Sequence, residues 1–196
     1  MSDLKVLIFA QKKGSAPAGA TLEVVTVGRQ LADKLGGKLG ALVIGSGTEV
    51  VAKELNAAGV DICYIVENAQ FDRFHDDAYA DILAELVKSK LPQIVLGTAN
   101  FYGRALFGRV AGMLGVGLAA DCNQVEIDGT GRLCVTRPAY GGKVNLTVQF
   151  KTAPQIATLR PKVFAEAKLD TARSGAIEPF ASSASSKLQV ETGAAG

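Results

Sequence analysis

The sequence predicts a three-layer α/β domain, in which helices cover both faces of a mostly parallel, doubly wound sheet. Short apolar runs of strand length alternate with segments whose apolar residues recur with a helical period. After the fourth such helix the pattern changes to short runs joined by turn residues, which predicts an antiparallel ribbon at the carboxyl end.

Four apolar runs are the predicted parallel strands. They cover residues 4–10, 39–44, 62–66 and 94–96. A first helix is predicted to begin near Thr21, which serves as an N-cap, and to end at Gly36. The order of strand and helix is that of a sheet whose parallel neighbours are joined by helical crossovers.

The helix predicted over residues 75–90 shows its period most clearly. Its apolar stripe at i, i+3, i+4, i+7 and i+8 consists of Tyr79, Ile82, Leu83, Leu86 and Val87. Each such side chain contributes about 1.5–3 kcal/mol when fully buried, so the stripe is sufficient to dock this helix on the sheet.

The carboxyl ribbon is predicted from two patterns. Short apolar runs on either side of residues 128–131 indicate a hairpin. In residues 143–150 apolar and polar side chains alternate strictly, which predicts a strand with one buried face. Arg137 and Arg160 each precede a proline, which lacks the donor that an interior strand needs, so both pairs are predicted to mark strand ends.

The composition beyond about Leu169 shifts to Ser, Ala, Gly and Thr. Such small side chains offset little of the ~1–2 kcal/mol per residue that ordering the backbone costs. We therefore expect residues 1–169 to form the domain and residues 170–196 to be a flexible linker. Phe180, Leu188 and Val190 are the residues able to anchor it.

Charge and composition argue against several functions. The 21 basic and 19 acidic residues leave a net charge of +2, which offers no electrostatic basis for binding nucleic acid. No segment approaches the ~20 apolar residues of a membrane span, so no membrane insertion is expected. Cys63, Cys122 and Cys134 lack C-x-x-C spacing, so we expect buried thiols in a reducing compartment: the cytoplasm, or the mitochondrial matrix in a eukaryote.

Three segments invite a nucleotide-binding interpretation. The Gly-Ser-Gly at 45–47 would need its third glycine where Val50 stands, so the dinucleotide fingerprint fails. Residues 12–15 offer cations and amides but not the P-loop spacing. The end of the fourth strand lies where open parallel sheets bind ligands. Its nucleotide-pocket candidates are Gly97, Thr98 and Asn100.

No catalytic constellation is recognised, and no metal site is expected. His75, the one histidine, lies among aspartates at a predicted helix start, where acidic residues are favoured without catalysis. Arg109 is either a partner contact or a long side chain that covers apolar surface.

Two stretches carry a family resemblance. Residues 136–150 (TRPAYGGKVNLTVQF) and 157–164 (ATLRPKVF) resemble the glycine turn, Lys-Val strand and Thr-x-Arg-Pro-x-x-Phe ending of the electron transfer flavoprotein alpha subunit, in its amino-terminal domain. Residues 103–111 and 119–121 are similar to that family's Gly-x-x-Leu-x-x-Arg-x-Ala helix and Ala-x-Asp strand entry. The resemblance extends from Leu4 to Phe164, although Gln11 stands where many members have Glu.

The resemblance implies an adenine nucleotide alpha hydrolase-like fold and an electron carrier rather than an enzyme. Members form an alpha-beta heterodimer that takes electrons from flavin dehydrogenases and passes them to an acceptor. They hold FAD through a carboxyl domain whose Gly-Gly-Arg-Gly loop has no counterpart here, so we expect no FAD on this chain alone and a linker leading toward that domain. The alternative is a stand-alone adenine-nucleotide-binding or hydrolysing domain that uses residues 97–103.

Within this resemblance, we expect the beta-subunit interface to lie partly on the ribbon. An aromatic residue beside cations on a glycine turn suits a protein contact, because Tyr and Arg are enriched at binding hot spots. The alternative is a solvated hairpin. The interface candidates are Arg109, Arg137, Tyr140, Lys143 and Arg160.

Overall fold

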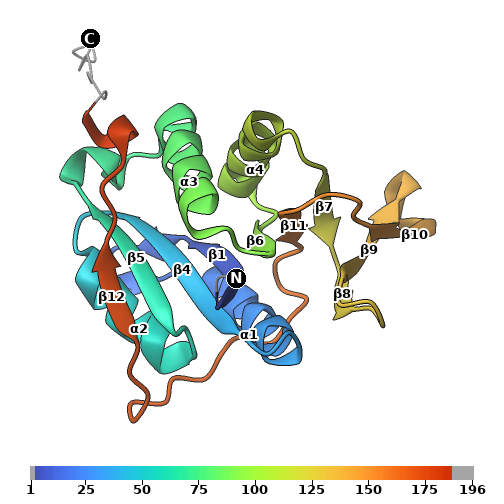
Figure 1. Ribbon diagram of the computed structural model, residues 1–196, viewed down its shortest axis with the longest axis horizontal. Helices are drawn as coiled ribbons and strands as arrows, with labels where there is room; N and C mark the ends of the chain where they lie inside the picture. The colour runs from blue at the N-terminus through green and yellow to red at the C-terminus, as the bar shows by residue number, and fades with distance from the viewer. Residues whose placement is uncertain (1–2, 187–196) are drawn as a thin grey trace.

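A seven-stranded parallel sheet forms the centre of the computed structural model, which describes residues 3–186 (Figure 1). Its strand order is β12-β5-β4-β1-β6-β11-β7. The strands are β1 (Leu4–Ala10), β4 (Lys38–Gly45), β5 (Ile62–Glu67), β6 (Ile94–Thr98), β7 (Leu118–Cys122), β11 (Gln155–Leu159) and β12 (Ala176–Pro179). A two-residue hairpin, β2 (Lys12–Lys13) and β3 (Ala16–Pro17), follows β1.

Four helices cover the two faces of this sheet. They are α1 (Gly19–Lys34), α2 (Thr48–Ala58), α3 (Asp76–Lys90) and α4 (Phe101–Leu114). Apolar residues of α1 and α2 belong to one buried cluster, and those of α3 and α4 belong to the other. The predicted three-layer, doubly wound fold is therefore confirmed.

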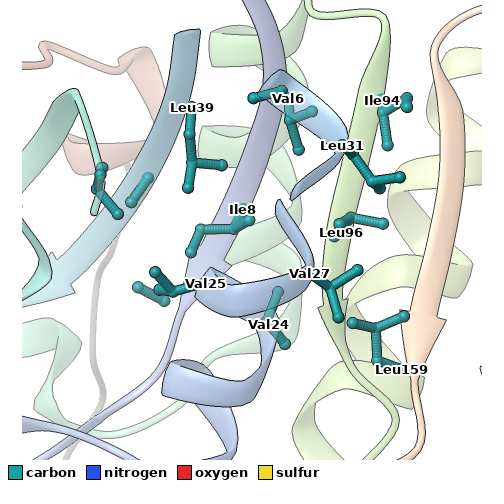
Figure 2. Close-up of a cluster of buried hydrophobic side chains, with 14 of the residues drawn as sticks. Val6, Ile8, Val24, Val25, Val27, Leu31, Leu39, Ile94, Leu96 and Leu159 are labelled. Atoms are coloured by element: carbon teal, nitrogen blue, oxygen red, sulfur yellow. The ribbon is translucent and has the colours of Figure 1, made fainter. Parts of the chain in front are cut away.

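The apolar core beneath α1 packs this helix against the sheet (Figure 2). Apolar side chains of α1 point toward those of β1, β4, β6 and β11 in one cluster. Its labelled members are Val6, Ile8, Val24, Val25, Val27, Leu31, Leu39, Ile94, Leu96 and Leu159. On the opposite face the predicted stripe of α3 is buried in full.

The start of α1 differs from the prediction. The helix begins at Gly19 with Ala18 at the N-cap. The hydroxyl of Thr21 donates to the carbonyl of Gln11 (2.9 Å) and accepts from the amide of Gln11 (3.0 Å). Thr21 is thus drawn to the end of β1 and is not available to cap its own helix.

The predicted ribbon is a three-stranded antiparallel sheet between β7 and β11 in the chain. It consists of β8 (Gln124–Ile127), β9 (Leu133–Ala139) and β10 (Val144–Gln149), with β9 in the middle. The predicted hairpin joins β8 and β9. The Asp128 Oδ1 fastens its turn by accepting from the Thr130 amide (2.8 Å), the Thr130 hydroxyl (2.7 Å) and the Arg132 amide (3.0 Å).

One of the two Arg-Pro pairs ends a strand and the other does not. Arg160 follows β11 directly, as predicted, whereas Arg137 and Pro138 lie inside β9. The last β8 pairing is that of Gln124 with Thr136, so at Pro138 the strand is paired on the β10 side alone. The proline is tolerated because β9 is locally an edge strand there.

The apolar face of β10, the strand predicted from alternating side chains, is only partly buried. Phe150 and the partly buried Val148 pack on the core, but Val144 and Leu146 are each 43% exposed. The antiparallel sheet extends beyond the body of the domain at the side of β7, so the outer end of its apolar face has no cover within the described residues (Figure 1).

Residues 161–186, which we call the strap, differ from the expected unpacked tail. The strap passes α1 and α2, where the Ala167 and Asp170 amides donate to the Leu22 and Ala57 carbonyls (3.1 and 2.9 Å), and then adds β12 to the edge of β5 (Figure 1). Phe180 packs on the α3 side of the core. Leu188 and Val190 lie outside the described residues.

Side chains of the body hold the strap in place. Glu23 of α1 accepts from the amides of residues 162–164, and Asn56 of α2 donates to the Gly175 carbonyl (3.0 Å). Glu85 of α3 accepts from the Ser182 hydroxyl (2.6 Å). The strap is ordered by polar groups of other elements and by an open sheet edge, neither of which the composition of the strap reveals.

Cys63, Cys122 and Cys134 are free and buried, as expected. Burial raises the pKa of the Cys63 and Cys122 thiols to about 12, so both stay protonated and unreactive near neutral pH. Between residues 3 and 186, no helix has both the length and the apolar content that crossing a bilayer would require.

Candidate functional site

Two regions at the carboxyl ends of the parallel strands hold most of the predicted site residues. The first is the corner between β1 and β6, where the strand order reverses and open sheets of this class bind ligands. The second is the surface where β7 and β11 end beside the antiparallel sheet.

Polar side chains at the corner form hydrogen bonds within the chain. The side-chain amide of Gln11 donates to Asn100 Oδ1 (3.1 Å), and that of Asn100 donates to Gln11 Oε1 (2.6 Å). Asn100 Oδ1 also caps α4 by accepting from the Gly103 amide (3.0 Å). The Thr98 hydroxyl donates to the Ala20 carbonyl (3.3 Å).

The glycines of the corner are required by packing. A Cβ on Gly97 would lie 2.1 Å from the Phe107 ring, and one on Gly103 would lie 1.8 Å from the Thr98 carbonyl oxygen. The loop that the nucleotide-binding alternative would use is thus closely packed, and its side chains bond within the chain.

Near residues 45–47, the backbone amides that could bind a phosphate already donate to carboxylates. Glu67 accepts from the Gly47 and Thr48 amides (2.7 and 2.8 Å) and from the Thr48 hydroxyl, so the N-terminus of α2 already has an anionic partner. Asp72 accepts from the Ser46 amide (2.9 Å) and pairs with Lys12 (2.8 Å). Gly-Ser-Gly is a turn and helix entry, as the failed fingerprint predicted.

A cavity of about 360 Å³ lies beside the corner, at the ends of β1 and β4. Four aromatic residues form part of its wall, and Lys12 and Lys13 also line it. This volume is at the low end of the range for small-molecule sites. The lining aromatic residues are Phe9, Phe74, Tyr79 and Tyr102.

Arg109 of α4 pairs with the first turn of α3, which follows His75. His75 is the N-cap, and Asp76 and Asp77 stand in the first turn, as predicted. Arg109 Nε donates to Asp76 Oδ2 (2.8 Å), and the same guanidinium pairs with Asp77. Arg109 therefore fastens α4 to α3, a role that sequence reasoning did not assign to it.

At the second region, Arg160 forms a two-point ion pair with Asp121. Its Nε and Nη2 lie 3.0 and 2.6 Å from the two carboxylate oxygens. This pair is the largest cause that lowers the pKa of Asp121, and the nearby Arg104 and Arg137 lower it further. The sequence analysis missed Arg104 and the central place of Asp121, because the residues come together only through the tertiary fold.

Tyr140 stands at the tip of the antiparallel sheet and is 79% exposed. Its φ of 51° is left-handed, and Gly141 and Gly142 follow at 67° and 86°. Such a conformation costs a non-glycine residue about 1–2 kcal/mol, and only the two glycines adopt it freely. Tyr140, Lys143 and Val144 thus lie together at an exposed tip. Arg137 lies directly opposite Leu146 in the register of β9 and β10, and Arg160 lies at the end of β11.

Folding stability should fall in acid because several exposed carboxylates have a lowered pKa. Lys12 is the largest cause for Asp72, and the Thr48 hydroxyl is the largest for Glu67. A folded-state pKa below the unfolded value stabilises the fold above that value, and the stabilisation is lost as the pH falls below about 4. We expect the melting temperature of Asp72→Asn to depend less on pH between about pH 6 and pH 3 than that of the wild type. Superimposable pH profiles would contradict this linkage.

The chain is similar to known proteins of one kind along most of its length. Residues 6–185 match the electron transfer flavoprotein domain family. The chain is 37% identical over 182 residues to the electron transfer flavoprotein subunit alpha of Thermoanaerobacterium thermosaccharolyticum, covering 92% of this chain and 55% of that protein. It is 36% identical over 165 residues to protein FixB of Rhizobium meliloti, covering 82% and 47%.

A further relative is the acryloyl-CoA reductase electron transfer subunit beta of Anaerotignum propionicum, 29% identical over 189 residues. The match covers 83% of this chain and 51% of that protein. The chain spans about half the length of the curated relatives it matches.

Proposed function

The chain belongs to the electron transfer flavoprotein family, and on that premise we propose that it forms the amino-terminal domain of an alpha-type subunit. This subunit pairs with a beta-type subunit, and the heterodimer carries electrons from flavin dehydrogenases to an acceptor. A cytoplasmic setting is part of the proposal, because three unpaired buried thiols fit a reducing compartment.

FAD, when bound by such a carrier, supplies the redox chemistry. The described residues do not fit it at the corner or at the start of α2. Gln11 and Asn100 bond to each other there, and Glu67 already accepts from the α2 amides that would hold a pyrophosphate. We therefore propose that this domain binds no FAD by itself and serves as a scaffold. The same filled corner weakens the alternative of a stand-alone nucleotide-binding domain.

The observation that carries the proposal is the uncovered outer face of the antiparallel sheet. Val144 and Leu146 stand on the face whose inner end, at Val135 and Val148, packs on the core. Tyr140 stands exposed at the tip of the same sheet. An apolar face with an aromatic residue beside it is typical of a subunit interface.

The test uses two substitutions on neighbouring residues of β10. Leu146→Asp places a charge on the apolar face, and Thr147→Asp places the same charge on the opposite face of the same strand. We expect Leu146→Asp to weaken binding of the beta-type subunit from the same genome roughly tenfold or more, because the contact would lose a buried leucine and would have to desolvate a carboxylate. Thr147→Asp should change affinity little.

Isothermal titration calorimetry with the purified subunits measures both affinities. Failure of the wild-type chain to bind the beta-type subunit would overturn the proposed function. Equal losses for the two variants would show that the apolar face of β10 is not the contact.

A further inference from the structure

Three arginines from three different elements gather around Asp121 at the carboxyl ends of β7 and β11. Arg104 comes from α4, Arg137 from β9 and Arg160 from the residue after β11. We call them the arginine cluster. Arg160 is held by its two-point pair with Asp121, so the cluster has a defined centre and does not consist of independent surface cations.

The cluster carries more positive than negative charge. Three guanidinium groups act on the single carboxylate of Asp121, and Arg160 already engages both oxygens of that carboxylate. Arg104 and Arg137 therefore add positive charge around Asp121 that its one carboxylate offsets only in part. An additional anion at this place would offset more of it.

Buried polar atoms beside the cluster also lack a partner. Within residues 3–186, Arg137 Nε and Asn123 Oδ1 are both buried and form no hydrogen bond. Asn123 precedes β8, and its amide donates to the carbonyl of Thr136 (2.9 Å), which places it next to Arg137 in the sheet. Buried groups of this kind are nearly always paired with protein or water, so the guanidinium of Arg137 still has unused hydrogen-bonding capacity.

The surroundings of the cluster favour a protein over a nucleic acid. Phe101 is 80% exposed and lies one helical turn before Arg104 on the same side of α4. Exposed aromatic residues next to arginines are the composition of a protein interface. A nucleic acid would need a broad basic surface, whereas the whole chain has a net charge of only +2.

We propose that the arginine cluster receives carboxylate side chains of the beta-type subunit, with Phe101 packed beside them. The inference rests on the proposed function and names the chemistry of the partner surface: acidic residues next to an apolar patch. The planar guanidinium groups suit this role because each can hold a carboxylate through two parallel hydrogen bonds.

Arg104 is the residue that tests the cluster with least risk to the fold. It is exposed and lies in the first turn of α4, where a glutamate is compatible with the helix dipole. Lys88 provides the matched control, since it is exposed near the end of α3 and lines a groove at the amino ends of the parallel strands, beside Leu4 and Lys5. Arg104→Glu and Lys88→Glu change the net charge equally.

Calorimetry of the full chain with the beta-type subunit from the same genome, between about 50 and 500 mM NaCl, measures the effect. We expect Arg104→Glu to raise the Kd about tenfold or more at low salt and by much less at high salt, because charges within an interface act through a screened field. Arg104→Gln should give a smaller loss. Lys88→Glu should stay within about twofold of the wild type.

The outcomes separate the two proposals. If the wild type binds and Arg104→Glu behaves like Lys88→Glu, the arginine cluster is not an acidic docking site, while the heterodimer stands. A loss for Arg104→Glu that is the same at all salt concentrations would also overturn the electrostatic role. If the wild type does not bind the beta-type subunit, the proposed function itself fails.

Discussion

Replacing Glu23 with alanine should lower the free energy of unfolding by about 3 kcal/mol and detach the strap from the domain. Glu23 is 6% exposed, and its carboxylate accepts from the amides of Lys162 (2.9 Å), Val163 (3.2 Å) and Phe164 (3.2 Å). Alanine leaves these donors without an acceptor, and hydrogen bonds to a charged group are among the stronger ones.

Urea unfolding gives the change in stability, and amide hydrogen exchange locates it. Exchange should become faster first in residues 162–170 and in β12, which the same segment leads into. The control is Glu49→Ala on α2, which removes an exposed carboxylate that pairs with Lys53, and it should cost less than about 0.5 kcal/mol. Equal losses for the two variants would show that Glu23 does not hold the strap.

Replacing Gly103 with alanine should destabilise the domain by about 3 kcal/mol. The added Cβ would lie 1.8 Å from the carbonyl oxygen of Thr98, a backbone atom at the end of β6. Either the start of α4 or the end of β6 must then shift, and the cap that Asn100 provides would be lost with it.

Gly108 supplies the matched control on the same helix. An alanine Cβ there has nothing within 4 Å, so Gly108→Ala should stabilise the helix by up to about 1 kcal/mol. At this chain length each kcal/mol shifts Tm by about 2–4 °C. The two variants should therefore move Tm, measured by circular dichroism, in opposite directions. A Tm for Gly103→Ala at or above that of the wild type would contradict the close approach of α4 to β6.

The filled corner bears on how much of the site could be predicted. Gly97, Thr98 and Asn100 are nucleotide-pocket candidates by position alone, because they lie at the carboxyl end of a strand next to the reversal of strand order. Position alone could not reveal that Gln11, 89 residues away, bonds to Asn100, or that Phe107 fills the space beside Gly97. Such long-range pairings leave no periodic signal in the sequence.

The sequence by itself determined the elements that depend on residues close together along the chain. The stripe of α3, the four apolar strands and the turn at Asp128 each depend on residues within one or two turns of each other. Side-chain periodicity reports burial for such elements, because it records which face of a helix or strand avoids water. The motifs at residues 136–150 and 157–164 likewise carried the family resemblance without any knowledge of the fold.

Only the tertiary structure decided the strap, the outer face of β10 and the arginine cluster. The strap is ordered by an open edge of β5 and by Glu23, Asn56 and Glu85 of the helices, so its own composition could not reveal it. Leu146 and Leu133 look alike in the sequence, yet one stands clear of the body and the other is buried. The difference arises because the alternation of a strand specifies which side chains share a face, whereas the rest of the fold specifies whether anything covers it.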